Sequence, residues 1–236
     1  MTALPSLEAL AGRLICWDLD KTLGIFRPLG RDRPGPRPPG PEQGLRPDVL
    51  EVISALDEAG ALQVITTAST RAHAERSLQR AELRPYIRRV YTGEELVTVY
   101  GVPTKDYTGV AHDFGLFGPE VSARMIVIGD TITLDLPSNG PVFVWERAGA
   151  RVSARLTLWI LATLANAGAG DFLAGYNALN ERERSPSALL GGELRGARVE
   201  APESFVLKLW VQSGTPVISL LSELDPRPLE LLPPMR

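Results

Sequence analysis

Two aspartates lie two residues apart, directly after a short apolar run near the start of the chain. The run covers Leu14 to Leu19, and Asp18 and Asp20 stand at its carboxyl end. Side chains at alternate positions of a strand point to the same side, so both carboxylates would enter one crevice. Two carboxylates at such a place repel each other and need a cation or a shared proton. The alternative is a polar strand end whose aspartate caps a helix.

Polar residues also follow two further apolar runs. Val64 and Ile65 lead into Thr67, and Met125 to Ile128 lead through a glycine into Asp130. The carboxyl ends of parallel strands meet at one edge of a sheet, where open α/β sheets bind ligands. The sequence therefore predicts that these side chains share a site with the two aspartates, although a threonine here would equally serve as a helix N-cap.

Strands alternate with helices along most of the chain, which predicts an α/β fold. We expect a Rossmann-like, three-layer arrangement, with a parallel sheet and helices on both faces. The predicted strands are 14–19, 62–65, 86–91, 125–128 and 142–145, the predicted helices are 48–59, 71–81 and 106–114, and 94–99 is a short helix or strand.

The last third of the chain is predicted to add to this core. Residues 1–150 would form the catalytic core, and residues 151–236 a helix and an appendage of mixed α and β character packed on it. The helix covers 150–169, and the helical periodicity weakens after Gly170. Two strands, 205–211 and 216–221, flank Ser213 and Gly214 as a predicted hairpin.

Residues 27–47 form an unusual segment rich in proline, glycine and arginine. Such a composition excludes a helix or a central strand, so we expect a surface loop or flap. Its arginines could hold a phosphopeptide or a nucleic-acid backbone, or form a solvated charged loop. They are Arg27, Arg31, Arg33, Arg37 and Arg46.

Composition and charge narrow the class of protein. The net charge of −3 and the pI of about 5.6 give no support for a nucleic-acid partner, without excluding one. The single cysteine, Cys16, lies in an apolar run and is expected to be buried and inert. Residues 156–169, the most apolar helix candidate, are too few to span a bilayer. We therefore expect a cytoplasmic protein without a membrane segment.

The Asp-x-Asp-x-Thr pattern at residues 18–22 resembles the first motif of the haloacid dehalogenase superfamily of phosphatases and phosphotransferases. The resemblance implies that Asp18 is the nucleophile and Asp20 the general acid and base. Thr67, Lys105 and Asp130 match the other three motifs in order. The Thr-Ala-Ser and Lys-Asp sequences resemble the branch that contains the phosphatases of the RNA polymerase C-terminal domain and the nuclear LIM interactor-interacting factors. The resemblance covers roughly residues 14–145.

The resemblance also implies a bound Mg²⁺ ion. Its ligands would be the Asp18 carboxylate, the backbone carbonyl of Asp20 and the Asp130 carboxylate, all hard oxygen donors. Lys105 and the Thr67 hydroxyl would hold the oxygens of the transferring phosphoryl group. The residues expected around these ligands, in contact with them or through water, are Thr22, Thr131 and Asp135.

The sequence predicts a Mg²⁺-dependent phosphatase that forms an aspartyl-phosphate. No folded cap fits between the motifs, so the substrate would be large, such as a phosphoserine or phosphothreonine protein. The alternatives are a phosphatase for small molecules or nucleic-acid ends, and an inactive binding module. Lys21 is expected to point away from the site, and His73 and His112 to be surface or packing residues.

Overall fold

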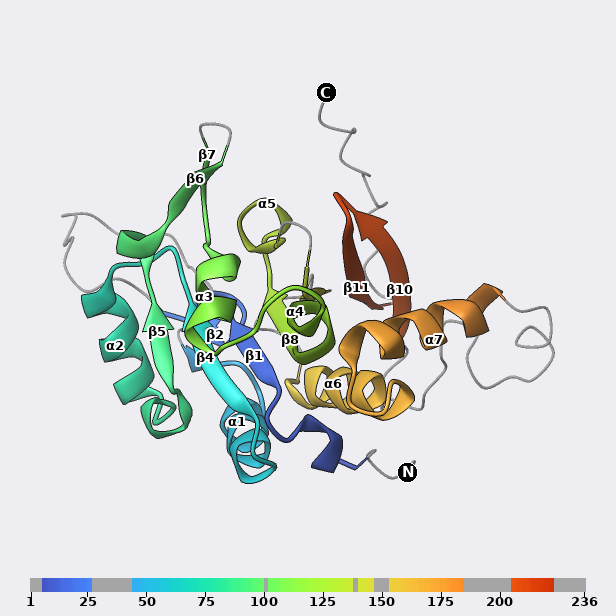
Figure 1. Cartoon of the computed structure of the whole chain (residues 1–236). Coiled ribbons are helices and arrows are strands. Elements are labelled where there is room, and N and C mark those ends of the chain that lie inside the picture. Colours follow the sequence, from blue (N-terminus) through green and yellow to red (C-terminus); the bar gives the residue numbers. More distant parts are fainter. Residues whose placement is uncertain are drawn as a thin grey trace.

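The computed structural model describes residues 6–26, 44–99, 102–137, 140–146, 153–184 and 205–222. Seven strands form its central sheet: β1 (Leu14–Trp17), β4 (Leu62–Thr66), β5 (Arg89–Tyr91), β8 (Met125–Gly129), β9 (Val142–Trp145), β10 (Phe205–Gln212) and β11 (Thr215–Ser222). Their order across the sheet is β10-β11-β9-β8-β1-β4-β5 (Figure 1). The strands from β11 to β5 are parallel, and β10 pairs antiparallel with β11 at one edge.

Helices cover both faces of this sheet, so the predicted α/β class is confirmed. The described helices are α1 (Val49–Glu58), α2 (Arg71–Arg80), α3 (Tyr107–Asp113), α4 (Pro119–Arg124), α5 (Ile132–Asp135), α6 (Arg155–Ala167) and α7 (Phe172–Arg184). Short 3-10 turns occur at Glu8–Leu10, Arg84–Tyr86 and Gly93–Glu95. Two small hairpins join β2 (Gly24–Ile25) to β3 (Gly44–Leu45) and β6 (Val97–Val99) to β7 (Val102–Thr104).

Two apolar clusters fill the space between the sheet and its helices. In β1, Ile15 and Trp17 pack in the cluster that includes α1, α2 and α6, whereas Leu14 and Cys16 pack in the cluster that includes α3. All four side chains are buried, because a central parallel strand is covered on both faces. The strand therefore reads as a continuous apolar run, which is why it was recognisable from the sequence.

The register of the central strands brings their carboxyl ends level. Trp17 is paired with Ile65 of β4 on one side and with Ile128 of β8 on the other. The backbone N–H of Asp18 still donates to the Ile128 carbonyl, at 2.8 Å. The chain segments that leave these three strands therefore start side by side, as the sequence predicted.

The end of the described chain extends the central sheet. The predicted hairpin around Ser213 is confirmed, and Val217 of β11 pairs in parallel register with Phe143 of β9. The predicted division of the chain near residue 150 stays a prediction. Helix α7 was missed, although Phe172, Tyr176 and Leu179 recur at helical spacing and all three are buried.

Two local predictions need correction, and a third is not tested. The strand expected at 86–91 is shorter, because Arg84–Tyr86 forms a 3-10 turn before β5 begins. The helix expected from residue 150 begins at Arg155. Residues 27–43 of the expected flap lie outside the described residues, as do the arginines at 27, 31, 33 and 37.

Arg46, which the sequence placed among the flap arginines, is a core residue. Its guanidinium donates to the Glu146 carboxylate at 3.0 Å, and both side chains are essentially inaccessible to solvent. The pair joins the segment before α1 to the segment after β9. Arg46 therefore does not contribute to a solvated or substrate-binding loop.

Among the described residues, no single helix is long and apolar enough to cross a membrane. The consecutive helices at Arg155–Ala167 and Phe172–Glu181 meet that requirement only when taken together, and they are bent by 89°.

Candidate active site

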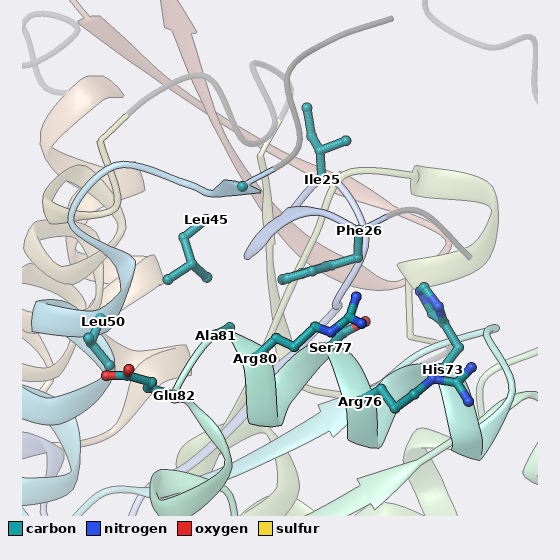
Figure 2. Close-up of a pocket in the computed structure, with 11 residues that line it drawn as sticks. Ile25, Phe26, Leu45, Leu50, His73, Arg76, Ser77, Arg80, Ala81 and Glu82 are labelled. Atoms are coloured by element: carbon teal, nitrogen blue, oxygen red, sulfur yellow. The ribbon is translucent and has the colours of Figure 1, made fainter. Parts of the chain in front are cut away.

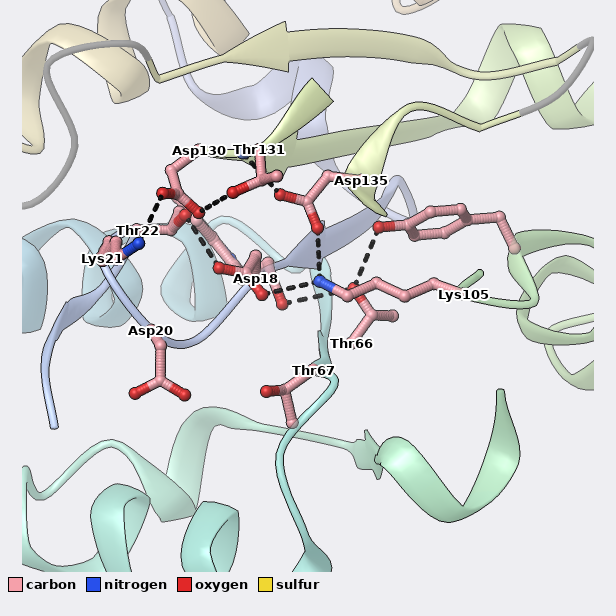
Figure 3. Close-up of polar contacts among 12 residues, drawn as sticks. Asp18, Asp20, Lys21, Thr22, Thr66, Thr67, Lys105, Asp130, Thr131 and Asp135 are labelled. Carbon is pink, nitrogen blue, oxygen red and sulfur yellow. Dashed lines mark hydrogen bonds and ion pairs between the residues drawn. The ribbon is translucent and has the colours of Figure 1, made fainter. Parts of the chain in front are cut away.

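Lys105 lies between two buried carboxylates at the carboxyl edge of the sheet (Figure 3). Its Nζ is 2.6 Å from Asp18 Oδ1 and 2.5 Å from Asp135 Oδ1. The three side chains are 5%, 9% and 2% exposed, respectively. Asp18 follows β1, Lys105 follows β7 and Asp135 ends α5, so separate parts of the chain converge here. The other Asp18 oxygen, Oδ2, accepts a hydrogen bond from the Thr22 hydroxyl at 3.2 Å.

Asp130 completes a group of three acids with Asp18 and Asp135. One carboxylate oxygen from each residue lies within 4.8 Å of the others, close enough to hold one metal ion. The Thr131 hydroxyl donates to Asp130 Oδ1 at 3.1 Å. Lys21 Nζ lies 4.0 Å from Asp130 Oδ2, although its side chain is 72% exposed. The prediction that Lys21 points away from the site is therefore wrong, because the turn after β1 carries it back toward β8.

The loop after β8 holds Asp135 against the end of that strand. Asp135 Oδ2 accepts a hydrogen bond from the Thr131 backbone N–H at 2.9 Å. A Cβ atom at Gly129 would collide with the Asp135 carboxylate, so the glycine allows this close approach. The sequence placed Asp135 outside the predicted ligand set of Asp18, Asp20 and Asp130. The structure brings its carboxylate into the group of three.

The Asp20 carboxylate points to a different part of the site. It accepts a hydrogen bond from the Ser69 hydroxyl at 2.8 Å, and its other oxygen lies 3.5 Å from His73 Nε2. Strand β1 ends at Trp17, so the alternation of a strand no longer applies at Asp20. Figure 3 shows Asp20 on the side of Asp18 away from Asp130. The two carboxylates of the first motif thus serve two neighbouring subsites.

His73 was expected to be a surface or packing residue, and this description is incomplete. The residue is 8% exposed and lies in the first turn of α2, which brings its ring to Asp20. The sequence held one signal of this contact, because His73 follows Thr67, the predicted second-motif residue, by only a few positions. His112, by contrast, stacks on Phe117 with ring centroids 4.9 Å apart, as a packing residue would.

Thr67 lies at the carboxyl end of β4 and is 3% exposed. Its hydroxyl oxygen accepts a hydrogen bond from the Ser69 backbone N–H at 3.1 Å, which fixes the loop that carries Ser69. In Figure 3, Thr67 and Asp20 lie on the same side of Asp18. The hydroxyl can still donate, so it is available to an oxygen of a ligand bound between them.

Tyr107 is a residue of the site that the sequence analysis missed. It is 5% exposed, and its hydroxyl lies 3.4 Å from that of Thr66. Burial raises the pKa of Tyr107 above its ordinary range, so the phenol stays neutral. Its position two residues after Lys105 was the available signal.

Burial and charge shift the proton affinities of the site in opposite directions. Burial raises the pKa of Asp18 from 3.8 to about 7, although Lys105 favours its ionised form. Burial, followed by the charge of Asp135, also raises the pKa of Asp130. Burial alone would lower the pKa of Lys105, but Tyr107 and the two carboxylates beside it raise that pKa overall. The Lys105 ammonium is therefore charged. It is one positive charge beside the three acids Asp18, Asp130 and Asp135, so a further cation is needed to balance them.

Cys16 lies under this site in β1 and is fully buried, as predicted. Burial raises the pKa of its thiol above the ordinary range. The thiolate, which is the reactive form, is therefore suppressed at neutral pH. Cys16 acts as a packing residue, and the chemistry of the site rests on its oxygens.

No family model matches the chain, and no curated protein matches it. Among solved structures, an uncharacterized protein from Listeria monocytogenes serotype 4b is 17% identical, with a TM-score of 0.41; the match covers 57% of this chain and 78% of that one. A 3-deoxy-D-manno-octulosonate 8-phosphate phosphatase from Moraxella catarrhalis, in complex with magnesium and phosphate ions, is 18% identical over 71% of this chain and 92% of that one, with a TM-score of 0.40. A haloacid dehalogenase-like hydrolase from Streptococcus pneumoniae is 15% identical over 63% and 90%, with a TM-score of 0.39. At these identities and TM-scores, the likenesses assign neither a family nor an activity to the chain.

Proposed function

We propose that this chain is a Mg²⁺-dependent phosphatase of the haloacid dehalogenase type, with Asp18 as its nucleophile. The observation that carries the proposal is the convergence of Asp18, Asp130 and Asp135 within 4.8 Å around the buried ammonium of Lys105. An apolar cluster in the same place would stabilise the fold better, because buried charges are costly to desolvate. Fold stability therefore does not explain this group. Two of these acids, Asp18 and Asp130, have raised pKa values, and such perturbed groups are typical of catalytic sites.

The donor set fits a hard divalent cation. Asp18, Asp130 and Asp135 provide carboxylate oxygens, and Mg²⁺ prefers a few such ligands together with water and a phosphate oxygen. Three carboxylates face one buried ammonium, so a divalent ion would bring the site close to neutrality. The Asp20 backbone carbonyl, as the resemblance implies, would be a further ligand. When bound, the ion would offset the repulsion between a carboxylate nucleophile and a phosphate dianion.

Asp18 would attack the phosphorus atom. Lys105 and Thr22 fix its two oxygens, and the pairing of Asp18 N–H with β8 fixes its backbone. In the first step an Asp18 oxygen forms a bond to phosphorus, and the bond to the ester oxygen breaks. An aspartyl-phosphate results. In the second step water attacks the phosphorus, the bond to Asp18 breaks, and inorganic phosphate is released.

Asp20 would supply and recover the proton. In its protonated form it donates to the departing ester oxygen, and as a carboxylate it then takes a proton from the attacking water. Ser69 orients one of its oxygens at 2.8 Å, and its side chain is 34% exposed, so it can exchange protons with solvent between turnovers. Lys105 and Thr67 would hold the transferring phosphoryl oxygens, which carry most of the negative charge.

The substrate we propose is a phosphoserine or phosphothreonine protein, or another large phosphomonoester. Among the described residues, the segments between the motifs form the β2–β3 hairpin, α1 and β4, and then α2, β5, two 3-10 turns and the β6–β7 hairpin. None of these elements forms a separate lid domain, and small substrates usually require a lid that excludes water. Residues 27–43 lie outside this description.

Turnover of p-nitrophenyl phosphate tests the reaction. We expect hydrolysis with Mg²⁺, none with EDTA, and none for Asp18→Asn. Asp57→Asn, which changes a half-buried carboxylate of α1 outside the site, is the matched control and should retain full activity. The Asp20→Asn variant should accumulate a covalent adduct heavier than the protein by one phosphoryl group in intact-mass measurements. A folded protein that shows neither turnover nor adduct with any divalent metal would instead be a binding module.

A further inference from the structure

A groove runs along one side of α2 and begins at His73. Its volume is about 380 Å³, within the usual range of ligand sites. Figure 2 shows the β2–β3 hairpin on one side of it and α2 on the other. The residues that line it are Ile25, Phe26, Gly44, Leu45, Leu50, His73, Arg76, Ser77, Arg80, Ala81 and Glu82.

The groove is continuous with the part of the active site that holds the proposed acid. His73 lines its near end, and His73 Nε2 is 3.5 Å from Asp20 Oδ1. Because Asp20 would protonate the ester oxygen of the substrate, the groove begins where the leaving group lies. A molecule bound along the groove would therefore be the leaving-group portion of the substrate.

The two walls of the groove differ in chemistry. The hairpin contributes apolar surface from Ile25, Phe26 and Leu45. The helix contributes two arginines, Arg76 and Arg80, which stand four positions apart and are both exposed. Such an arrangement suits a ligand with an apolar body and a negative charge.

The arginines direct their charge toward the active site. Long side chains on a helix lean toward its N-terminus, which here is the end at His73. Figure 2 shows both Arg76 and Arg80 extending in that direction. Glu82, the acid among the lining residues, lies toward the opposite end, beside Leu50 (Figure 2).

These two guanidinium groups differ from their neighbours on the same surface. Arg71 pairs with Glu95 at 2.9 Å and Arg84 with Glu75 at 2.8 Å. Within the described part of the chain, Arg76 and Arg80 have no carboxylate within 4.0 Å. Within that part of the chain, no carboxylate competes with an anionic group of a ligand for these two guanidinium groups.

We propose that the groove binds an acidic residue about two positions from the phosphorylated residue of a peptide substrate. The proposal rests on the phosphatase function above and names its substrate class. His73 and Arg80 lie seven positions apart on α2, about 10 Å along the helix axis. Extended peptide spans at most about 3.3–3.6 Å per residue, so the groove accommodates roughly three residues. An acidic side chain about two residues from the phosphoserine would meet the arginines, while an apolar side chain rests on the hairpin.

Steady-state kinetics on three phosphoserine peptides tests this inference. The peptides share one sequence and carry Asp, Asn or Lys at the second position on each side of the phosphoserine. For the wild-type protein we expect a kcat/KM about tenfold higher for Asp than for Asn, a size that suits two partly exposed charge contacts. The Lys peptide should be the poorest substrate. In the Arg76→Gln, Arg80→Gln variant the three values should converge.

A charge-reversed variant sharpens the experiment. Arg76→Glu with Arg80→Glu should exchange the preference, so that the Lys peptide becomes the best substrate. The matched control is Arg88→Gln with Arg155→Gln, which removes two exposed arginines outside the groove and should preserve the preference for Asp. All variants should melt near the wild-type temperature and hydrolyse p-nitrophenyl phosphate at the wild-type rate, because that substrate is too short to reach the arginines.

The possible results separate this inference from the proposed function. Loss of all turnover, on p-nitrophenyl phosphate and peptides alike, in wild-type protein would overturn both. Normal turnover with equal kcat/KM for the three peptides would overturn only the groove. A small bisphosphorylated sugar that is hydrolysed faster than every peptide, with the advantage lost in the Arg76→Gln, Arg80→Gln variant, would overturn the peptide assignment.

Discussion

Asp18→Asn should stabilise the metal-free protein while it removes the activity. The carboxylate of Asp18 is buried beside Asp130 and Asp135, and one ammonium offsets the three acids. Burial raises the pKa of Asp18 from 3.8 to about 7. The folded state thus resists the ionisation of Asp18, and an amide at this position carries no charge to resist.

The size of the effect follows from the pKa. A rise of roughly three pKa units corresponds to about 4 kcal/mol, since each unit is worth about 1.36 kcal/mol. This value already includes the interaction with Lys105. An amide does not reproduce every hydrogen bond of the carboxyl group, however, and one buried hydrogen bond left unmade costs about 1–3 kcal/mol. We therefore expect a net gain of about 2 kcal/mol at pH 8 without metal. For a chain of this length, that gain raises the Tm by roughly 4–8 °C.

The gain should depend on pH in a defined direction. Between about pH 4 and pH 7 the folded protein keeps the Asp18 proton that the unfolded chain has released, so the wild-type stability falls as the pH rises. The stability of Asp18→Asn has no such dependence on pH. The amount by which it exceeds the wild-type stability should therefore be smaller at pH 5 than at pH 8. Mg²⁺ should raise the Tm of the wild-type protein by mass action and should raise that of the variant much less.

Thermal unfolding followed by circular dichroism, at pH 5 and at pH 8 and with either EDTA or Mg²⁺, gives the Tm of each protein under all four conditions. Asp57→Asn serves as the control, because its carboxylate is outside the site and should leave each Tm within about 2 °C of the wild type. Two results would refute the reasoning. One is an Asp18→Asn variant less stable than the wild type at pH 8 in EDTA. The other is an equal Mg²⁺-induced rise in Tm for both proteins.

Three further substitutions test separate parts of the structure. Lys105→Met leaves two buried carboxylates without their ammonium and should lower the free energy of unfolding in urea by about 3–5 kcal/mol, with loss of turnover. A variant as stable as the wild type would contradict the buried ion pairs. Ser69→Ala frees Asp20 to rotate, so hydrolysis of alkyl phosphates, whose leaving group must be protonated by an acid, should slow about tenfold. Hydrolysis of p-nitrophenyl phosphate, which has a good leaving group, should change less than about twofold, and equal effects on both substrates would argue against an orienting role for Ser69. Arg46→Met removes the cation beside Glu146, which then keeps, among the described residues, only its hydrogen bond with Thr157, and should cost about 3–5 kcal/mol in urea unfolding. The kinetics of the remaining folded protein should not change, and a cost below about 1 kcal/mol would contradict a buried ion pair.

The sequence was most informative where a residue's role depends on its immediate neighbours. The apolar runs of β1, β4 and β8 are buried on both faces, so they could be recognised without knowledge of their partners. Turn chemistry likewise predicted the C-terminal hairpin at Ser213 and Gly214. Because parallel strands end at one edge, the positions of Asp18 and Asp130 at strand ends were enough to predict that they meet.

The sequence was less informative where a residue's role depends on contacts with distant parts of the chain. Arg46 looks like one more arginine of a polar loop, but a partner one hundred residues later makes it a core residue. His73 and Ser69 acquire their relation to Asp20 only through the angle at which α2 leaves the sheet. The approach of β11 to β9 is equally invisible in the sequence, since register is set by packing partners rather than by a strand's own residues.

The amino-acid sequence by itself determined the alternating fold, the order of the polar strand ends and the candidate acids, although it placed Asp135 outside the predicted ligand set. The tertiary structure decided which of those acids face one another: Asp135 joins Asp18 at Lys105, whereas Asp20 turns toward α2. The physical reason is that strand and helix signals depend on local periodicity. The direction of a side chain in a loop depends on the backbone turns and on partners that only the folded chain brings within hydrogen-bonding distance.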